Sequence, residues 1–150
     1  MSFMRVSAAD LEVTMRDADR AEEFLAEYVP PETDPSGYLD KSWAGLKYLL
    51  EAAETGIDLF FTGTPSAIDE YIGWTAEDVS YTAELLGKTP FRILAAHYDP
   101  NGMDEAGVYP QIWLRDGNVG LDYLGQYYAV LVEVFEHAAR HRSGLLQHFG

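Results

Sequence analysis

The pattern that most constrains the fold is a long amphipathic repeat near the C-terminal end of the chain. Apolar residues recur there at intervals of three and four, which places them on one face of a helix: Leu121, Leu124, Tyr128, Leu131, Phe135 and Ala138. Asp122 lies near the start of this repeat and Arg140 at its end, as the helix dipole favours. We therefore expect a long C-terminal helix that ends before Gly144.

Short apolar segments at both ends of the chain are typical of strands. Phe3–Val6 opens the sequence, and Leu145–Phe149 follows the predicted long helix. Helical packing between them would let these strands pair, and residues 71–74 form a further candidate strand. The segment from 57 to 74 is otherwise ambiguous, because Leu59-Phe60-Phe61 fits a strand as well as a buried helical turn.

Polar residues at helix starts divide the rest of the chain into further helices. Ser7, Asp17 and Thr75 each stand before a helical pattern, as capping residues do. Asp40 is expected to cap a helix that carries Trp43 and Leu46. The predicted fold class is α+β, mostly helical, with a small sheet that includes the N- and C-terminal strands. The length of 150 residues predicts one domain over residues 1–150.

The charge balance excludes some classes of partner and favours another. The chain has 25 acidic and 10 basic residues, a formal net charge of -15. Nucleic acids and anionic membrane surfaces would be repelled, so neither is expected to bind. A basic protein is the partner that this charge favours.

The sequence also restricts location and chemistry. The first 13 residues lack the apolar stretch of a secretory signal, and no later segment has the length of a membrane span, so we expect a cytoplasmic protein. The absence of cysteine excludes disulfides and thiolate metal sites. No phosphate-binding loop or catalytic motif occurs, and we expect no cofactor.

Two histidines one helical turn apart suggest a metal site at first sight. His137 and His141 follow Glu133, so a divalent ion would find three ligands on one helix face. The zinc protease motif requires a glutamate directly after its first histidine, and Ala138 stands there. We therefore predict that Glu133 and His137 form an ordinary helical pair near the negative helix end and that no metal binds.

The best candidate binding residues lie at the predicted helix start around Asp40. Asp40, Lys41 and Trp43 combine a capping carboxylate, a cation and a large aromatic ring, and His97 and Tyr109 are added as further candidates. A purely structural role, in which Asp40 caps the helix and Trp43 packs, is the simpler interpretation of this motif. Aromatic residues are numerous, and tyrosine and tryptophan are enriched at protein interfaces.

Three stretches of the chain resemble the uncharacterised family typified by the bacterial protein YfbM. They are Met1–Ser7, the segment Leu39–Leu50 with its Leu-Asp-Lys-Ser-Trp motif, and Tyr98–Trp113 with its Tyr-Asp-Pro and Val-Tyr-Pro motifs. The resemblance implies a mostly helical α+β fold around a small sheet, and it implies no activity or catalytic residue. Residues 55–75 form a shorter stretch than is usual in the family.

Two functional hypotheses follow, together with a simpler explanation. The first is a non-enzymatic interaction module, of the inhibitor or immunity type, whose acidic surface meets a basic protein. The alternative is a small-molecule-binding protein or hydrolase with a pocket near Asp40, Lys41, Trp43, His97 and Tyr109. The simpler explanation is that the acidity only keeps the protein in solution.

Overall fold

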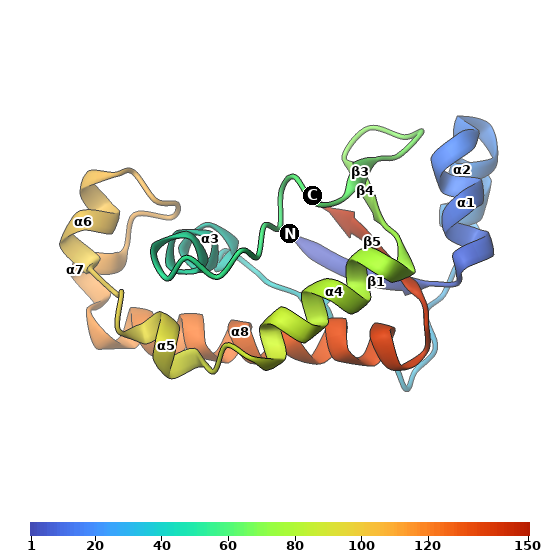
Figure 1. Cartoon of the computed structure of the whole chain (residues 1–150). Helices are drawn as coiled ribbons and strands as arrows, with labels where there is room; N and C mark the ends of the chain where they lie inside the picture. The colour runs from blue at the N-terminus through green and yellow to red at the C-terminus, as the bar shows by residue number, and fades with distance from the viewer.

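A five-stranded antiparallel sheet organises the chain, and a computed structural model describes all residues from 1 to 150. The strand order is β2-β1-β5-β4-β3, from β1 (Ser2–Val6), β2 (Gly37–Tyr38), β3 (Thr64–Pro65), β4 (Tyr71–Trp74) and β5 (Gly144–His148). The two terminal strands are neighbours, with Ser2 opposite His148, so both chain ends lie close together (Figure 1). The predicted pairing of the terminal strands is confirmed.

The chain also forms eight helices. They are α1 (Ala8–Arg16), α2 (Ala18–Glu27), α3 (Trp43–Ala52), α4 (Ala76–Gly87), α5 (Phe91–Ala95), α6 (Pro100–Glu105), α7 (Trp113–Asp116) and α8 (Asn118–Arg140). The predicted long C-terminal helix is α8, which runs along most of the molecule and ends before α1 and α2 (Figure 1). Its C-terminal half lies under the sheet, and α3, α5, α6 and α7 gather around its N-terminal half. The mostly helical α+β prediction is confirmed.

The strands alternate their side chains between two hydrophobic clusters, as the pleat requires. Phe3, Trp74 and Leu145 point to the larger cluster, which α4 and α8 cover. Val6 and Leu146 point to the opposite face, where they pack with Leu11 of α1. The sheet therefore lies between two helical layers, and the larger core continues beyond its edge toward α3.

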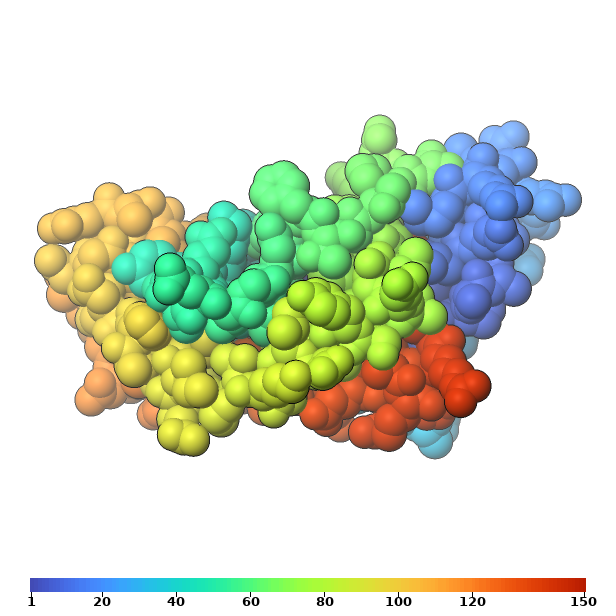
Figure 2. Space-filling view, in the orientation of Figure 1, coloured from blue at the N-terminus to red at the C-terminus, as the bar shows by residue number.

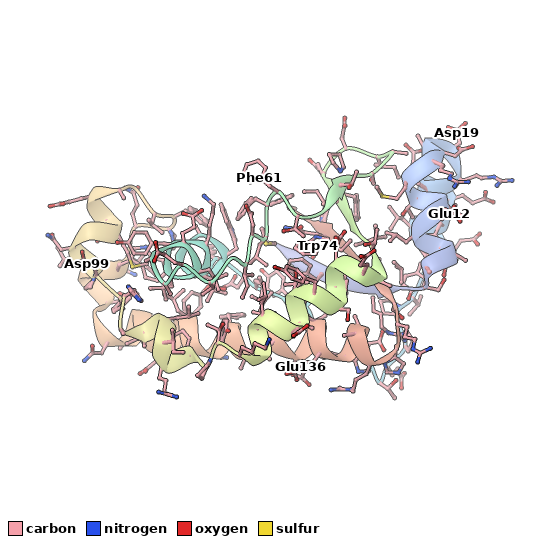
Figure 3. The ribbon with its side chains drawn as sticks, in the orientation of Figure 1. Glu12, Asp19, Phe61, Trp74, Asp99 and Glu136 are labelled. Atoms are coloured by element: carbon pink, nitrogen blue, oxygen red, sulfur yellow. The ribbon has the colours of Figure 1, made fainter.

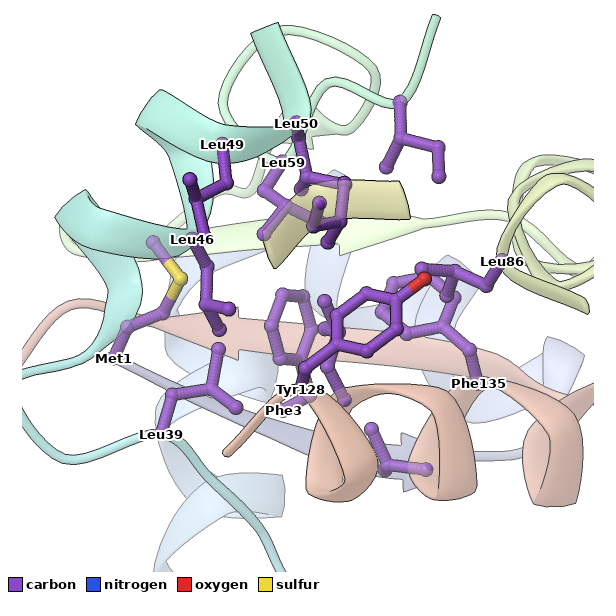
Figure 4. Packing of buried hydrophobic residues seen from close by; sticks show 14 of the residues in the cluster. Met1, Phe3, Leu39, Leu46, Leu49, Leu50, Leu59, Leu86, Tyr128 and Phe135 are labelled. Carbon is purple, nitrogen blue, oxygen red and sulfur yellow. The ribbon is translucent and has the colours of Figure 1, made fainter. Parts of the chain in front are cut away.

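The larger core holds the ends of the chain and the long helix together. Met1, Leu39 and Leu46 belong to the same buried cluster as Tyr128 and Phe135 of α8 (Figure 4). The rings of Phe3 and Phe135 meet edge to face with centroids 5.2 Å apart. Phe135 meets Trp74 in the same way, also at 5.2 Å. This aromatic contact joins α8 to both β1 and β4.

Three of the predicted helix caps are present. The side chains of Ser7, Asp17 and Thr75 accept hydrogen bonds from the backbone N–H three residues later. The glycine-rich segment 117–120 leads directly from α7 into α8, and only Gly117 lies between the two helices. Gly117 adopts a positive φ of 52°, and Asn118 already begins α8. The long helix is therefore one turn longer at its N-terminal end than the hydrophobic repeat indicates.

Replacing Gly37 with alanine is expected to separate β2 from β1. A Cβ atom at this position would lie 2.1 Å from the carbonyl oxygen of Phe3, and a backbone atom in a paired strand has no room to move. We expect a loss of about 2 kcal/mol in the free energy of unfolding, measured by urea denaturation. Gly87→Ala is the control, because nothing lies within 4 Å of its new methyl group. Equal stability of both variants would contradict the prediction.

None of the helices has both the length and the apolar composition that crossing a bilayer requires. The longest helix, α8, is amphipathic and buries one face against the core.

Candidate functional site

Two of the predicted binding residues, Trp43 and Tyr109, lie in direct contact. Trp43 is the first residue of α3, and Tyr109 belongs to the turn between α6 and α7. Their rings stack with centroids 5.6 Å apart and planes 25° from parallel. Trp43 is half-buried, whereas 44% of Tyr109 remains exposed. Two segments that are distant in the sequence thus present aromatic rings at one surface.

The aromatic contacts continue across the surface to the C-terminal end of the chain. Trp43 also meets Phe60 at 5.8 Å, and Phe60 meets Phe149 at 5.7 Å. Phe61, the next residue, is 84% exposed, and Phe149 is 40% exposed. Figure 3 shows the Phe61 ring projecting away from the ribbon between α3 and β3. We call Trp43, Phe60, Phe61, Tyr109 and Phe149 the aromatic face.

A local turn explains why Phe61 points outward while Phe60 stays partly buried. Asp58 Oδ1 accepts hydrogen bonds from the backbone N–H groups of Phe60 at 2.8 Å and Phe61 at 3.1 Å. Such an Asx turn reverses the chain, so Leu59 enters the core while Phe61 stays in solvent. The segment is neither a strand nor a helical turn. It protrudes in the space-filling view, where residues near 60 are green (Figure 2).

A groove of about 280 Å³ lies beside the Trp43–Tyr109 stack. One wall is the outer side of α3, with Lys47, Tyr48 and Glu51, and the turn that carries Tyr109 forms the other. Lys47 Nζ lies 3.2 Å from Glu51 Oε1 and 5.4 Å from the centroid of the Phe60 ring. An adjoining hollow of about 310 Å³ is lined by Lys47 and by the carboxylates of Glu51, Glu54 and Asp58.

The prediction that Asp40 caps α3 is wrong. The residue preceding the helix is Ser42, which makes no side-chain cap bond, and Asp40 has a positive φ of 49°. The carboxylate of Asp40 instead accepts hydrogen bonds from Tyr123 at 2.6 Å and from Tyr38 at 3.2 Å. The left-handed backbone of Asp40 directs its side chain toward Tyr123 of α8. Spacing in the sequence does not reveal this partner.

Asp40 is thus the acceptor in a tyrosine cluster. The hydrogen bond from Tyr123 holds the pKa of Asp40 below its ordinary value, although burial opposes this shift. Burial and the same hydrogen bond raise the pKa of Tyr123. The Tyr123 oxygen also accepts a bond from the backbone N–H of Lys41 at 3.1 Å. This cluster links the segment before α3 to α8, which is a structural role.

The remaining predicted residues lie outside the groove. Lys41 is exposed next to Asp40, and His97 is exposed after α5. Neither residue lines the groove that Trp43 and Tyr109 border, nor does Asp40. The structure therefore brings together Trp43 and Tyr109 from the predicted set, and it adds Phe60, Phe61 and Phe149, which no motif had indicated.

A second polar cluster joins β1 to the C-terminal end of α8, and sequence reasoning missed it. Asp34 accepts two hydrogen bonds from the guanidinium of Arg5, at 2.9 and 3.1 Å, and a third from His137 Nε2 at 2.9 Å. Because a carboxylate can only accept, His137 carries its proton on Nε2. The side chain of Asp34 is only 5% exposed. Ser143 completes the cluster by accepting a bond from Arg5 at 3.2 Å.

The position of His137 changes the interpretation of the histidine pair. Its partner is Asp34, 103 residues earlier, and not Glu133 one turn before it. His141 bonds the backbone carbonyl of His137 through Nδ1 at 2.8 Å. No three His, Asp or Glu side chains are arranged to hold a metal ion. The cluster instead connects the 28–38 segment to β1 and to the C-terminal end of α8.

The architecture described above is shared with a solved α+β structure of unknown function. YfbM from Escherichia coli superposes with a TM-score of 0.68, covering 96% of this chain and 95% of YfbM. The two sequences are 13% identical, so this likeness shows the fold alone.

The sequence itself assigns the family. Residues 1–148 match the family described as "Domain of unknown function (DUF1877)", and the chain belongs to this family. The YfbM-like resemblance of its motifs is thereby confirmed. No curated protein sequence matches the chain.

Proposed function

We propose that this protein is a non-enzymatic binding module that docks a basic protein partner on its aromatic face. The single observation that carries the proposal is the row of contacting rings from Tyr109 through Trp43 and Phe60 to Phe149, with Phe61 exposed beside it. Three separate segments and the chain end contribute to this row. Large aromatic residues at the centre of an interface supply most of its binding energy.

The charge of the protein supports a basic partner over a neutral one. Carboxylates border the aromatic face, with Glu51 and Asp58 close to Trp43 and Phe60. The net charge of -15 would draw a cationic protein toward this surface and repel nucleic acids and anionic membranes. Aromatic faces also attract cations directly. We place this interaction in the cytoplasm, as the sequence predicts.

A defined peptide tests the proposal. We expect a short peptide of alternating arginine and leucine to bind, and its citrulline counterpart, which lacks the charge, to bind weakly. Trp43→Ala removes a ring within the row, and Phe61→Ser removes the exposed ring beside it. Affinity for the arginine peptide should fall about 30-fold in each variant, measured by isothermal titration calorimetry. Circular dichroism confirms that the variants remain folded.

Tyr81→Ser is the matched control, because Tyr81 of α4 is also exposed and lies outside the aromatic face. It should bind as the unaltered protein does. Equal losses of peptide affinity in Tyr81→Ser and Phe61→Ser would show that the aromatic face has no specific role in binding. If the arginine peptide does not bind at all, the proposal is overturned and the acidity serves solubility alone.

The alternative proposal is a small-molecule-binding protein or hydrolase. The groove beside Trp43 and Tyr109 supports small-molecule binding, since its volume of about 280 Å³ is close to that of ligand pockets. Hydrolysis has less support, because Asp40 is hydrogen-bonded to two tyrosines and His97 lies outside the groove. Binding of free arginine as tightly as the peptide would favour this alternative.

A further inference from the structure

The groove beside the Trp43–Tyr109 stack combines the groups that recognise an organic cation. Trp43, Tyr48 and Tyr109 supply ring surfaces, and Glu51 supplies a carboxylate at the same groove. Ring faces attract cations through their quadrupole, and a carboxylate adds a charge-assisted hydrogen bond. The hollow next to it adds Glu54 and Asp58, so the surroundings of Glu51 are acidic.

A cation of the protein itself already uses this arrangement. The ammonium group of Lys47 lies 5.4 Å from the centroid of Phe60 and 3.2 Å from Glu51. Its side chain is 40% exposed, so the ion pair is screened by water and weak. A better cation can therefore displace Lys47 from Glu51 at little cost.

We infer that this groove receives an arginine side chain of the docked partner, stacked on Trp43 or Tyr109 and hydrogen-bonded to Glu51. The inference rests on the proposed function and names the group that the aromatic face recognises. Arginine fits better than lysine because its guanidinium is planar, weakly hydrated and able to stack and donate two parallel hydrogen bonds at once. Lys47 acts as an internal competitor for the same carboxylate.

This competition leads to a test in which two neighbouring substitutions act in opposite directions. Glu51→Gln removes the acceptor charge and should weaken binding of the arginine and leucine peptide about tenfold. Lys47→Met removes the competitor and a like charge, so it should strengthen binding about fourfold. Replacing arginine by lysine in the peptide should weaken binding to the unaltered protein and reduce the effect of Glu51→Gln.

Matched controls separate the groove from the overall charge. Glu77→Gln in α4 and Lys88→Met directly after it make the same charge changes at exposed positions, and both should leave the affinity nearly unchanged. Tryptophan fluorescence gives an independent readout, because Trp74 and Trp113 are fully buried and Trp43 is half-buried. We expect the peptide to protect Trp43 from acrylamide quenching, and Trp43→Phe to abolish this signal.

The outcomes distinguish the arginine groove from the proposed function of the aromatic face. The arginine groove is overturned if Glu51→Gln and Glu77→Gln weaken peptide binding equally, or if Lys47→Met does not strengthen peptide binding. The proposed function then still stands provided that Phe61→Ser weakens binding. If no arginine peptide binds, the proposed function fails and the groove assignment fails with it.

Discussion

Replacing Gln147 with leucine is expected to lower the free energy of unfolding by about 3 kcal/mol. Gln147 is fully buried in β5 and satisfies two other buried groups. Its Oε1 accepts a hydrogen bond from Trp74 Nε1 at 2.8 Å, and its Nε2 donates to the carbonyl of Leu59 at 2.9 Å. Leucine fills a similar volume but leaves the indole N–H and the carbonyl without partners, which is the costly situation for buried polar groups.

Thermal unfolding followed by circular dichroism measures this effect. A loss of about 3 kcal/mol corresponds to a decrease of about 10 °C in the melting temperature of a domain of this size. Gln126→Leu is the matched control, since Gln126 is exposed on α8, and it should melt close to the unaltered protein. Adding Trp74→Phe removes the indole donor, so the double variant should lose less stability than the sum of the two single variants. Strict additivity would contradict the proposed hydrogen bond.

Replacing Asp34 with asparagine is expected to cost about 3 kcal/mol at neutral pH, because it leaves Arg5 and His137 without their shared carboxylate. The side chains of Arg5 and His137 are only 19% and 15% exposed, so water compensates little for the loss. Asp69→Asn is the control, since Asp69 is exposed in the loop before β4 and takes part in no ion pair. Urea denaturation at pH 7 gives the difference.

The stability difference between the unaltered protein and Asp34→Asn should also depend on pH. Burial alone would raise the pKa of Asp34, but the hydrogen bonds from Arg5 and His137 outweigh it, and the pKa lies below the ordinary value of 3.8. Folding thus favours the ionised form of Asp34. Its stabilisation of the fold is fully present above the unfolded-state pKa of 3.8. This stabilisation is lost as the pH falls through the lower pKa of the folded state. The stability gap between the protein and Asp34→Asn should therefore narrow below pH 3.8. A gap that stays constant down to the acid-unfolded state would contradict the assignment.

Local signals in the sequence predicted the helices well. The caps at Ser7, Asp17 and Thr75 act within three residues of themselves, so the chain carries the whole interaction in one segment. The same reasoning was wrong at Asp40, where a positive φ turns the side chain away from α3 and toward Tyr123. The three capping residues have an extended backbone, which Asp40 lacks.

The candidate site was predicted only in part, because local sequence patterns do not show which distant residues meet. Trp43 was selected together with Asp40 and Lys41 as one motif, and Tyr109 and His97 were further candidates. Trp43 and Tyr109 do stack, whereas Lys41 and His97 do not line the groove. Phe60 and Phe61 lay in the segment whose structure the sequence left ambiguous, and their positions depend on an Asp58 turn that periodicity does not detect.

The sequence by itself determined the long helix α8, the helices α1, α2, α3 and α4 and the strands at both ends, because hydrophobic period and capping are local properties of the chain. Tertiary structure alone decided which distant side chains meet. Asp34 reaches Arg5 across 29 residues and His137 across 103, and the aromatic face draws on α3, two turns and the chain end. Such contacts depend on how helices and sheet pack in space, and no spacing in one linear sequence specifies that arrangement.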